Sequence, residues 1–313
     1  MKTSHTNQTS RIAALCSSWA GRSALAALTI ALAASTALAQ TITMSALPLR
    51  FTVPVGASST NTSTLTFTTA GLPVDGSGIV NLAVVGVPSG CGATLSTNFF
   101  SNNISGGTFV LTLTNDASVA QGLYEMAIQA SGAASKYLAI PVEIAYVWSG
   151  LNFSNLVSTN FASAGNWNGG VVPPTGSRVV FNDGGGQAVA TGSTNIIISA
   201  NTELGSVRFA NTGSGTRAHN IEIQSGATLK ISGTGQSFSL LRDTKGLGNP
   251  LLVLMAGNGS LVVTNSTADI VNLVDNQQVG TLDLRNLNSF RAEVVRFGMG
   301  DYRMYPNYYT NGY

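Results

Sequence analysis

Charged residues are scarce in this sequence, at 9% of 313 residues, against about 25% in an ordinary soluble domain. Beyond the N-terminal segment there is also no long stretch rich in Ala, Glu, Lys and Leu, which excludes helical bundles and coiled coils. The 35 glycines are spread among β-branched runs, and Thr, Ser and Asn supply the polar residues. This composition predicts an all-β protein, and the length allows about two domains.

Acidic residues are absent from the segment 1–39, which instead begins with a basic part containing Lys2, Arg11 and Arg22. An apolar stretch follows at 24–38, and Ala39 precedes Gln40. This order is typical of a secretory signal peptide, predicted over residues 1–39 and removed after Ala39. A retained membrane anchor is the alternative, but the apolar stretch is short for a bilayer. We therefore expect a bacterial protein that is secreted, extracellular or on the outer cell surface, with no membrane-spanning segment after cleavage.

Basic residues are too few and too scattered for nucleic-acid binding, because cleavage leaves 12 basic against 13 acidic residues. A polyanion needs many cations on one face to displace its counterions. Cleavage also leaves Cys91 as the single cysteine and His219 as the single histidine. We expect Cys91 to be a small buried residue and His219 to lie in a solvated polar turn. So few nitrogen and sulfur ligands exclude a zinc site, and no cofactor is expected.

Residues 40–146 alternate apolar and polar side chains in short segments separated by Gly, Asn and Ser turns. The alternating segments are Thr64–Thr68, residues 80–84, 109–113 and 124–128, and residues 138–144. Alternation with a period of two places one set of side chains on a buried face and the other in water. Six or seven such strands in this length predict a sandwich of two sheets.

Two runs in this region carry a resemblance. They are GVPSGCGATLSTN over residues 86–98 and GGTFVLTLTNDASVAQGLYEMAIQAS over residues 106–131. The region resembles bacterial secreted immunoglobulin-like modules, which implies an immunoglobulin-like β-sandwich over residues 40–146. Such modules act as spacers, stalks or sugar-binding appendages, so the resemblance implies a fold more than a function.

The sequence pattern changes after Trp148. The run NWNGGVVPPTGSRVVF over residues 166–181 is similar to the opening of autotransporter-like parallel β-helix passengers, although Ser177 stands where these proteins usually have Asp. The resemblance implies a right-handed parallel β-solenoid over residues 147–301, with Trp167 covering its open end. Trp148 and Trp167 are expected to be packing residues at the junction and the cap.

A short strand motif after a turn supports repeating units in this second region. It occurs at 206–209, 228–231, 260–263 and 281–284. We interpret the spacing as a period of about 21 residues, with an insertion around 240–250. A leucine-rich repeat is the alternative, but only the last unit fits its spacing.

Few residues in the sequence are candidates for catalysis or metal binding. An acid cluster of the kind that glycosidases and β-helix lyases use could form from Asp269, Asp275 and Asp283 with Arg285, but an ordinary solvated ion pair is the favoured interpretation. A calcium site is disfavoured, because the Gly-rich turn at 182–186 supplies only one carboxylate. We predict no catalytic residue, no metal and no cofactor.

The last segment, residues 302–313, concentrates five of the eight tyrosines and either caps the solenoid or begins an unseen continuation. Exposed aromatic rings can stack on sugars, so Tyr302, Tyr305, Tyr308 and Tyr309 are candidate glycan contacts. The sequence therefore predicts a non-enzymatic structural or adhesion protein, whose partner would be a cell-surface or matrix polysaccharide. The alternative is a β-helix protein that binds or degrades polysaccharides.

Overall fold

The computed structural model describes residues 40–47, 50–72, 78–101, 106–148, 159–182, 187–188, 194–211, 217–233, 238–242, 251–269 and 280–296. The predicted signal peptide and the Tyr-rich segment lie outside these ranges. Within them the chain is all-β, as expected, with one short 3-10 helix, η1 (Ala164–Asn166). None of the described helical residues forms a segment of the length and hydropathy that a membrane crossing requires.

The strands in chain order are β1 (Thr41–Leu47), β2 (Phe51–Pro54), β3 (Ser59–Ala70), β4 (Val80–Val85), β5 (Cys91–Leu95), β6 (Phe99–Phe100), β7 (Gly107–Asn115), β8 (Gly122–Gly132), β9 (Lys136–Trp148), β10 (Arg178–Phe181), β11 (Gln187–Ala188), β12 (Ile196–Ile198), β13 (Thr202–Leu204), β14 (Ser206–Asn211), β15 (Arg217–Ile223), β16 (Thr228–Ile231), β17 (Phe238–Arg242), β18 (Leu251–Asp269) and β19 (Gly280–Arg296).

Strands β1 to β9 form two sheets that share one hydrophobic core. The first sheet has the order β1-β3-β7-β5 and is antiparallel, and in the second β9, β8, β4 and β6 are antiparallel neighbours. The expected alternation is confirmed in β3, where Leu65 and Phe67 are fully buried, Thr64 and Thr68 are exposed, and Thr66 is partly exposed. Other core residues from both sheets are Val80, Leu82, Leu111, Leu113, Met126, Ile128, Ile140, Val142 and Ile144.

Strand β9 differs from the others because both of its faces are buried along residues 140–145. One edge pairs with β8. The other edge pairs first with β2, over Val142–Ala145, and then with β10, over Tyr146–Trp148. A strand covered on both faces and paired on both edges has few positions that tolerate water, which explains the nearly continuous apolar run from Leu138 to Trp148. The expected division between residues 146 and 147 stays a prediction, and β9 runs through it.

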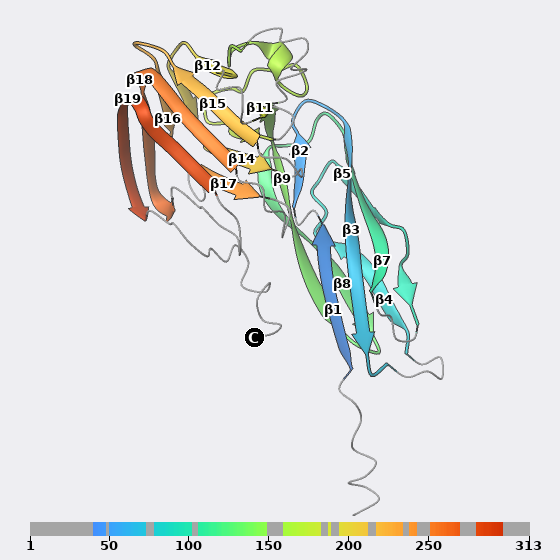
Figure 1. Cartoon of the computed structure of the whole chain (residues 1–313). Helices are drawn as coiled ribbons and strands as arrows, with labels where there is room; N and C mark the ends of the chain where they lie inside the picture. The colour runs from blue at the N-terminus through green and yellow to red at the C-terminus, as the bar shows by residue number, and fades with distance from the viewer. Residues whose placement is uncertain are drawn as a thin grey trace, which may run out of the picture.

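After β9 the chain winds through three parallel ladders (Figure 1). The first contains β9, β10, β14 and β17. The second contains β12, β15, the first part of β18 and the first part of β19, and the third contains β13, β16 and the later parts of β18 and β19. In Figure 1 the yellow-to-red strands lie at the upper left, and the blue-to-green strands lie to the right of them and below.

The short period expected from the strand motif is wrong. In register, Ser206 pairs with Arg178 and Thr228 pairs with Ser260, and each pair is further apart in the chain than the expected period. The four expected units are divided among the ladders: residues 206–209 belong to the first, 228–231 and 260–263 to the third, and 281–284 to the second. Each turn contains several short strands with the same apolar alternation, so a repeated motif does not show which strands stack. The turn that contains the expected insertion around 240–250 is the longest of its ladder, because Ile221 and its partner Met255 are 34 residues apart, against 25 from Ile196 to Ile221 and 29 from Leu251 to Gly280.

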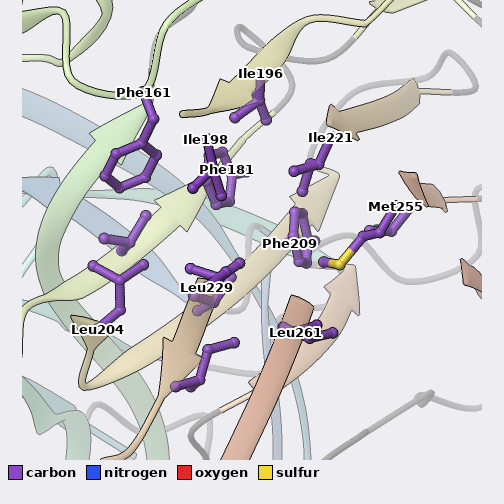
Figure 2. Close-up of a cluster of buried hydrophobic side chains, with 14 of the residues drawn as sticks. Phe161, Phe181, Ile196, Ile198, Leu204, Phe209, Ile221, Leu229, Met255 and Leu261 are labelled. Atoms are coloured by element: carbon purple, nitrogen blue, oxygen red, sulfur yellow. The ribbon is translucent and has the colours of Figure 1, made fainter. Parts of the chain in front are cut away.

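The interior of the ladders is filled by apolar side chains from every strand that borders it. Phe181 and Phe209 stack in successive strands with ring centroids 5.0 Å apart. Figure 2 shows these rings beside Ile198, Leu229 and Leu261, which come from the other two ladders. These side chains are almost completely excluded from water. Burial of side chains of this size contributes about 1.5–3 kcal/mol each.

Trp148 and Trp167 close this interior at its beginning, as predicted. Their rings meet edge to face with centroids 5.1 Å apart, and Trp167 meets Phe161 in the same way at 4.9 Å. The indole N–H of Trp167 donates to the Phe161 carbonyl oxygen at 2.9 Å. Both tryptophans are at most 1% exposed. The polar end of Trp167 is therefore satisfied while its ring covers the apolar stack.

Glycines at one corner permit the turns to stack closely. A Cβ added to Gly205 would lie 2.4 Å from the Gly176 carbonyl oxygen, and one added to Gly233 would lie 1.8 Å from the Gly205 carbonyl oxygen. Any larger residue at Gly205 or Gly233 would collide with the backbone of the preceding turn. These three glycines form a column that follows the stacking of the turns.

Candidate functional site

The sequence-predicted acid cluster does not form among the described residues. Asp283 lies in β19, in register with Leu254 near the start of β18, whereas Asp269 lies at the end of β18, in register with Arg296. Asp275 lies outside the described residues. The two described carboxylate positions therefore stand at opposite ends of the β18–β19 ladder, and two-carboxylate chemistry requires neighbours.

Asp283 and Arg285 do form the expected surface pair. Arg285 donates from Nη2 to Asp283 Oδ2 at 2.6 Å and from Nε to Oδ1 at 2.9 Å, and its side chain is 86% exposed. The hydrogen bonds from Arg285 lower the pKa of Asp283 to about 2. A carboxyl group that remains ionised at neutral pH is a poor general acid. This geometry supports the interpretation as a solvated ion pair.

The prediction of a solvated turn around His219 is wrong. His219 lies within β15 and is 0% exposed. Its ring centroid lies 5.4 Å from that of Phe209 and 6.0 Å from that of Phe181. The polar neighbours suggested a turn, but β15 pairs in parallel with β18, which places His219 in register with Val253. His219 is therefore a packing residue of the ladders.

Cys91 is half-buried at the start of β5, less enclosed than expected, and it packs against the core of the first two sheets. Burial, followed by the charge of Asp116, raises its pKa. A raised pKa disfavours the thiolate, which is the reactive form. The candidate glycan contacts Tyr302, Tyr305, Tyr308 and Tyr309 lie outside the described residues, as does most of the turn at 182–186. No group of three or more His, Cys, Asp or Glu within metal-binding reach occurs in the described ranges.

The structure contains a buried charge cluster that sequence reasoning missed. It consists of Glu143 on β9 with Arg50, Arg178 and Arg208, and we call it the junction cluster. Arg50 Nη1 donates to Glu143 Oε2 at 3.2 Å, Arg208 Nε donates to the same oxygen, and Arg178 Nε lies 3.6 Å from Oε1. The Glu143 and Arg208 side chains are each only 3% exposed.

The register of the strands explains how these residues meet. Val180 stands in register with Val147 on β9 and with Arg208 on β14, so these three side chains share one face of the sheet. Glu143 lies on that same face of β9, four residues before Val147. Arg50 directly precedes β2, whose Thr52 is in register with Glu143. The junction cluster therefore connects the elements before β9 with the parallel ladders after it.

Burial of Glu143 would by itself raise its pKa, but the charges of Arg208, Arg50 and Arg178 and the hydrogen bond from Arg208 outweigh burial and lower it. The carboxylate is thus held ionised inside the protein. Removal of one partner from such a pair leaves uncompensated charge in a poorly solvated place. The ion pairs therefore hold the strands of the junction in one geometry. The Glu143 carboxylate has little capacity to take up or release a proton at neutral pH.

A pH dependence follows from this pKa. The folded-state pKa of Glu143 lies below the unfolded value of about 4.3, so its stabilising contribution is complete above that value and is lost as the pH falls through the folded pKa. We expect the difference in unfolding free energy between wild type and Glu143→Gln to shrink between pH 5 and pH 3, as measured by urea denaturation. A difference that grows on acidification would contradict the assignment.

One signal in the sequence could have indicated the cluster. Glu143 is the single charged residue between Leu138 and Trp148, and Arg208 stands alone in the apolar run of β14. Isolated charges in strands that are otherwise apolar are rare unless they are paired. Their partners are distant in sequence, however, so the pairing itself depends on the fold.

No protein-family model matches the chain, and no curated protein matches it. Among solved structures, WR4, an MSP family member from C. elegans, is 10% identical with a TM-score of 0.25, covering 33% of this chain and 97% of that one. A GH5 xyloglucanase from Bacteroides ovatus is 11% identical with a TM-score of 0.20, and the match covers 61% of this chain and 46% of that one. The chain thus spans about half of the xyloglucanase. Likenesses this distant carry no argument, so function has to be inferred from the residues of this chain.

Proposed function

We propose that this chain is a non-catalytic structural or adhesion protein that is secreted by a bacterium or held on its outer surface. An immunoglobulin-like β-sandwich, residues 40–146, is followed by a right-handed parallel β-solenoid from residue 147. The resemblance of the two regions to secreted modules and to autotransporter-like passengers supports this architecture. One antiparallel sheet, packed against a second sheet whose strands β9, β8, β4 and β6 are antiparallel, and three parallel ladders are compatible with it.

The observation that supports the proposal most strongly is the way in which the first two sheets and the parallel ladders are joined at β9. Strand β9 hydrogen-bonds to strands of both halves, and the junction cluster ties Arg50, Glu143 and Arg208 together beside it. Domain interfaces within a chain are usually small and permit relative motion. A shared strand with buried ion pairs removes that freedom, which suits a protein that holds a surface at a fixed distance and orientation.

The surface composition supports the same role. With few charged residues in the sequence, exposed strand faces carry neutral polar side chains, such as the row of Thr60, Thr62, Thr64 and Thr68 along β3. Such a row offers hydroxyl groups for weak, repeated contacts with a matrix. The second candidate function is polysaccharide binding or degradation. Exposed aromatic residues favour binding, whereas the ionised Asp283 paired with Arg285 does not favour degradation.

Turnover measurements test the proposal. The purified full chain is incubated with neutral and acidic polysaccharides while reducing ends and unsaturated uronates are measured, beside Asp283→Asn. We expect no product from either protein, because Asp283 is held by Arg285. Protease treatment of intact source cells should degrade the protein if it lies outside the cell. Product from the wild type, whether or not Asp283→Asn abolishes it, or protection from protease, would contradict the proposal.

A further inference from the structure

Exposed apolar side chains gather at one end of the second sheet. The described residues include seven exposed large hydrophobic residues, and Ile79, Phe99 and Tyr137 are three of them, at 42%, 54% and 42% exposure. All three lie near the end of β8: the Ile79 carbonyl accepts a hydrogen bond from Ala133 N, and the register connects Phe99 through Asn81 to Ser131 and pairs Tyr137 with Gln129. Isolated surface hydrophobics are common, but a cluster calls for an explanation.

The strand register places two of these residues in adjacent rows of the outward face. Phe99, Asn81 and Ser131 are direct partners across β6, β4 and β8, and Ala83, Gln129 and Tyr137 are direct partners across β4, β8 and β9. Directly opposed residues point to the same side of a sheet. All six side chains are exposed, whereas their chain neighbours Val80, Leu82, Phe100 and Ile128 belong to the core. We call these six residues the distal face.

The chemistry of the distal face is polar in the middle and aromatic at the two sides. Asn81, Gln129 and Ser131 offer amide and hydroxyl groups, and none of the six side chains is charged. Phe99 and Tyr137 stand three strands apart, roughly 15 Å across the sheet. A protein–protein interface has the opposite layout, with an apolar centre and a polar rim. The absence of charge also disfavours polyanions.

We propose that the distal face binds a neutral polysaccharide, laid across β6, β4, β8 and β9. Phe99 and Tyr137 stack on sugar rings at the two sides, where aromatic faces meet the apolar C–H surface of the sugar. Asn81, Gln129 and Ser131 hydrogen-bond to hydroxyl groups between them. A small molecule would need a concave pocket, whereas the outer side of a sheet is open to a long polymer. The inference rests on the proposed adhesion function and gives it a ligand class and a site.

Affinity electrophoresis tests the site with the full chain. Gels contain hydroxyethylcellulose, galactomannan or, as an acidic polymer, alginate. We expect at least one neutral polymer to retard the wild type and alginate to leave it unaffected. Phe99→Ala and Tyr137→Ala should each weaken the retardation several-fold, and the double variant should bind about tenfold more weakly or worse, since tenfold corresponds to about 1.4 kcal/mol.

Phe290→Ala is the matched control. Phe290 is 41% exposed on β19 and undergoes the same substitution away from the distal face. We expect it to bind like the wild type, and thermal melting should show all variants folded, because the substituted side chains are exposed. Failure of both neutral polymers to bind, or undiminished binding by the double variant, would overturn the site. Reduced self-association of the double variant in sedimentation, without polymer binding, would likewise overturn it in favour of a contact between copies. The outer-surface location and the absence of turnover are measured separately, so the site can fail while the proposed function stands.

Discussion

Replacing Glu143 with glutamine should lower the free energy of unfolding by about 3–5 kcal/mol, because loss of a buried ionic partner leaves its partner charges uncompensated. Arg50 and Arg208 both donate to Glu143 Oε2, and they are only 7% and 3% exposed. Because glutamine has nearly the same shape as glutamate, the decrease in unfolding free energy measures the effect of the lost charge more than a change in packing. Urea denaturation at pH 7, monitored by tryptophan fluorescence, measures the change.

Glu293→Gln is the matched control for this substitution. Glu293 pairs with Arg291 on β19, and both side chains are more than half exposed. Exposed ion pairs contribute about 0–1 kcal/mol, so the control should change stability very little. If Glu143→Gln cost no more than Glu293→Gln, the junction cluster would have no role in holding the two halves together.

Truncation of Trp167 should have a comparable effect. Trp167→Ala removes the ring that covers the first turn of the ladders and leaves a cavity against Trp148 and Phe161. Large-to-small substitutions of a buried aromatic residue cost about 3–5 kcal/mol. We expect an unfolding midpoint at clearly lower urea, with loss of the near-ultraviolet dichroism of the packed tryptophans.

Val171→Ala provides the comparison, because Val171 follows the same turn and is 44% exposed. A substitution at such a position usually changes stability by less than about 0.5 kcal/mol. Trp167→Phe, which keeps an aromatic ring but loses the hydrogen bond to the Phe161 carbonyl, should fall between the two. Equal stability of Trp167→Ala and Val171→Ala would contradict the capping role.

Local patterns in the sequence predicted much of the fold. The alternation around Leu65 and Phe67 corresponds to a strand with the expected burial, because burial of one strand face depends on residues two apart. The same expectation for residues 138–144 is wrong on the face predicted to be in water, because residues 140–145 of β9 are buried on both faces. Which strands stack on one another depends on residues a whole turn apart. Because apolar alternation occurs in several strands within one turn, it does not show which of them are stacking partners.

The spacing of three glycines predicts the stacking of the turns better than the spacing of the strand motifs does. Gly176, Gly205 and Gly233 recur at nearly equal intervals, close to the register steps of the ladders around them. Each step brings a glycine against the backbone of the preceding turn, where a side chain would collide. A period read from these positions would have placed the turns nearer to their observed register.

The functional residues were harder to predict than the fold. His219 was predicted to be exposed to solvent because polar residues such as Arg217 and Asn220 lie near it in the sequence. The face of β15 that carries the His219 ring is instead buried. Glu143 is separated in the chain from Arg208 by 65 residues and from Arg50 by 93 residues, distances that no local pattern encodes. Phe99 and Tyr137 were not singled out, because they come to lie in adjacent rows of one face only after β4, β6, β8 and β9 have paired.

The position of β9 also has a consequence for the order of assembly. Once β9 has paired with β8 and β2, the edge at Tyr146–Trp148 offers unsatisfied backbone groups to β10. Domains that emerge first tend to fold first, and stacked repeats grow by adding each unit to its neighbour. We therefore expect the first half of the chain to act as a template to which each later turn is added, so that an error in its own pairing would be passed on to every turn that follows.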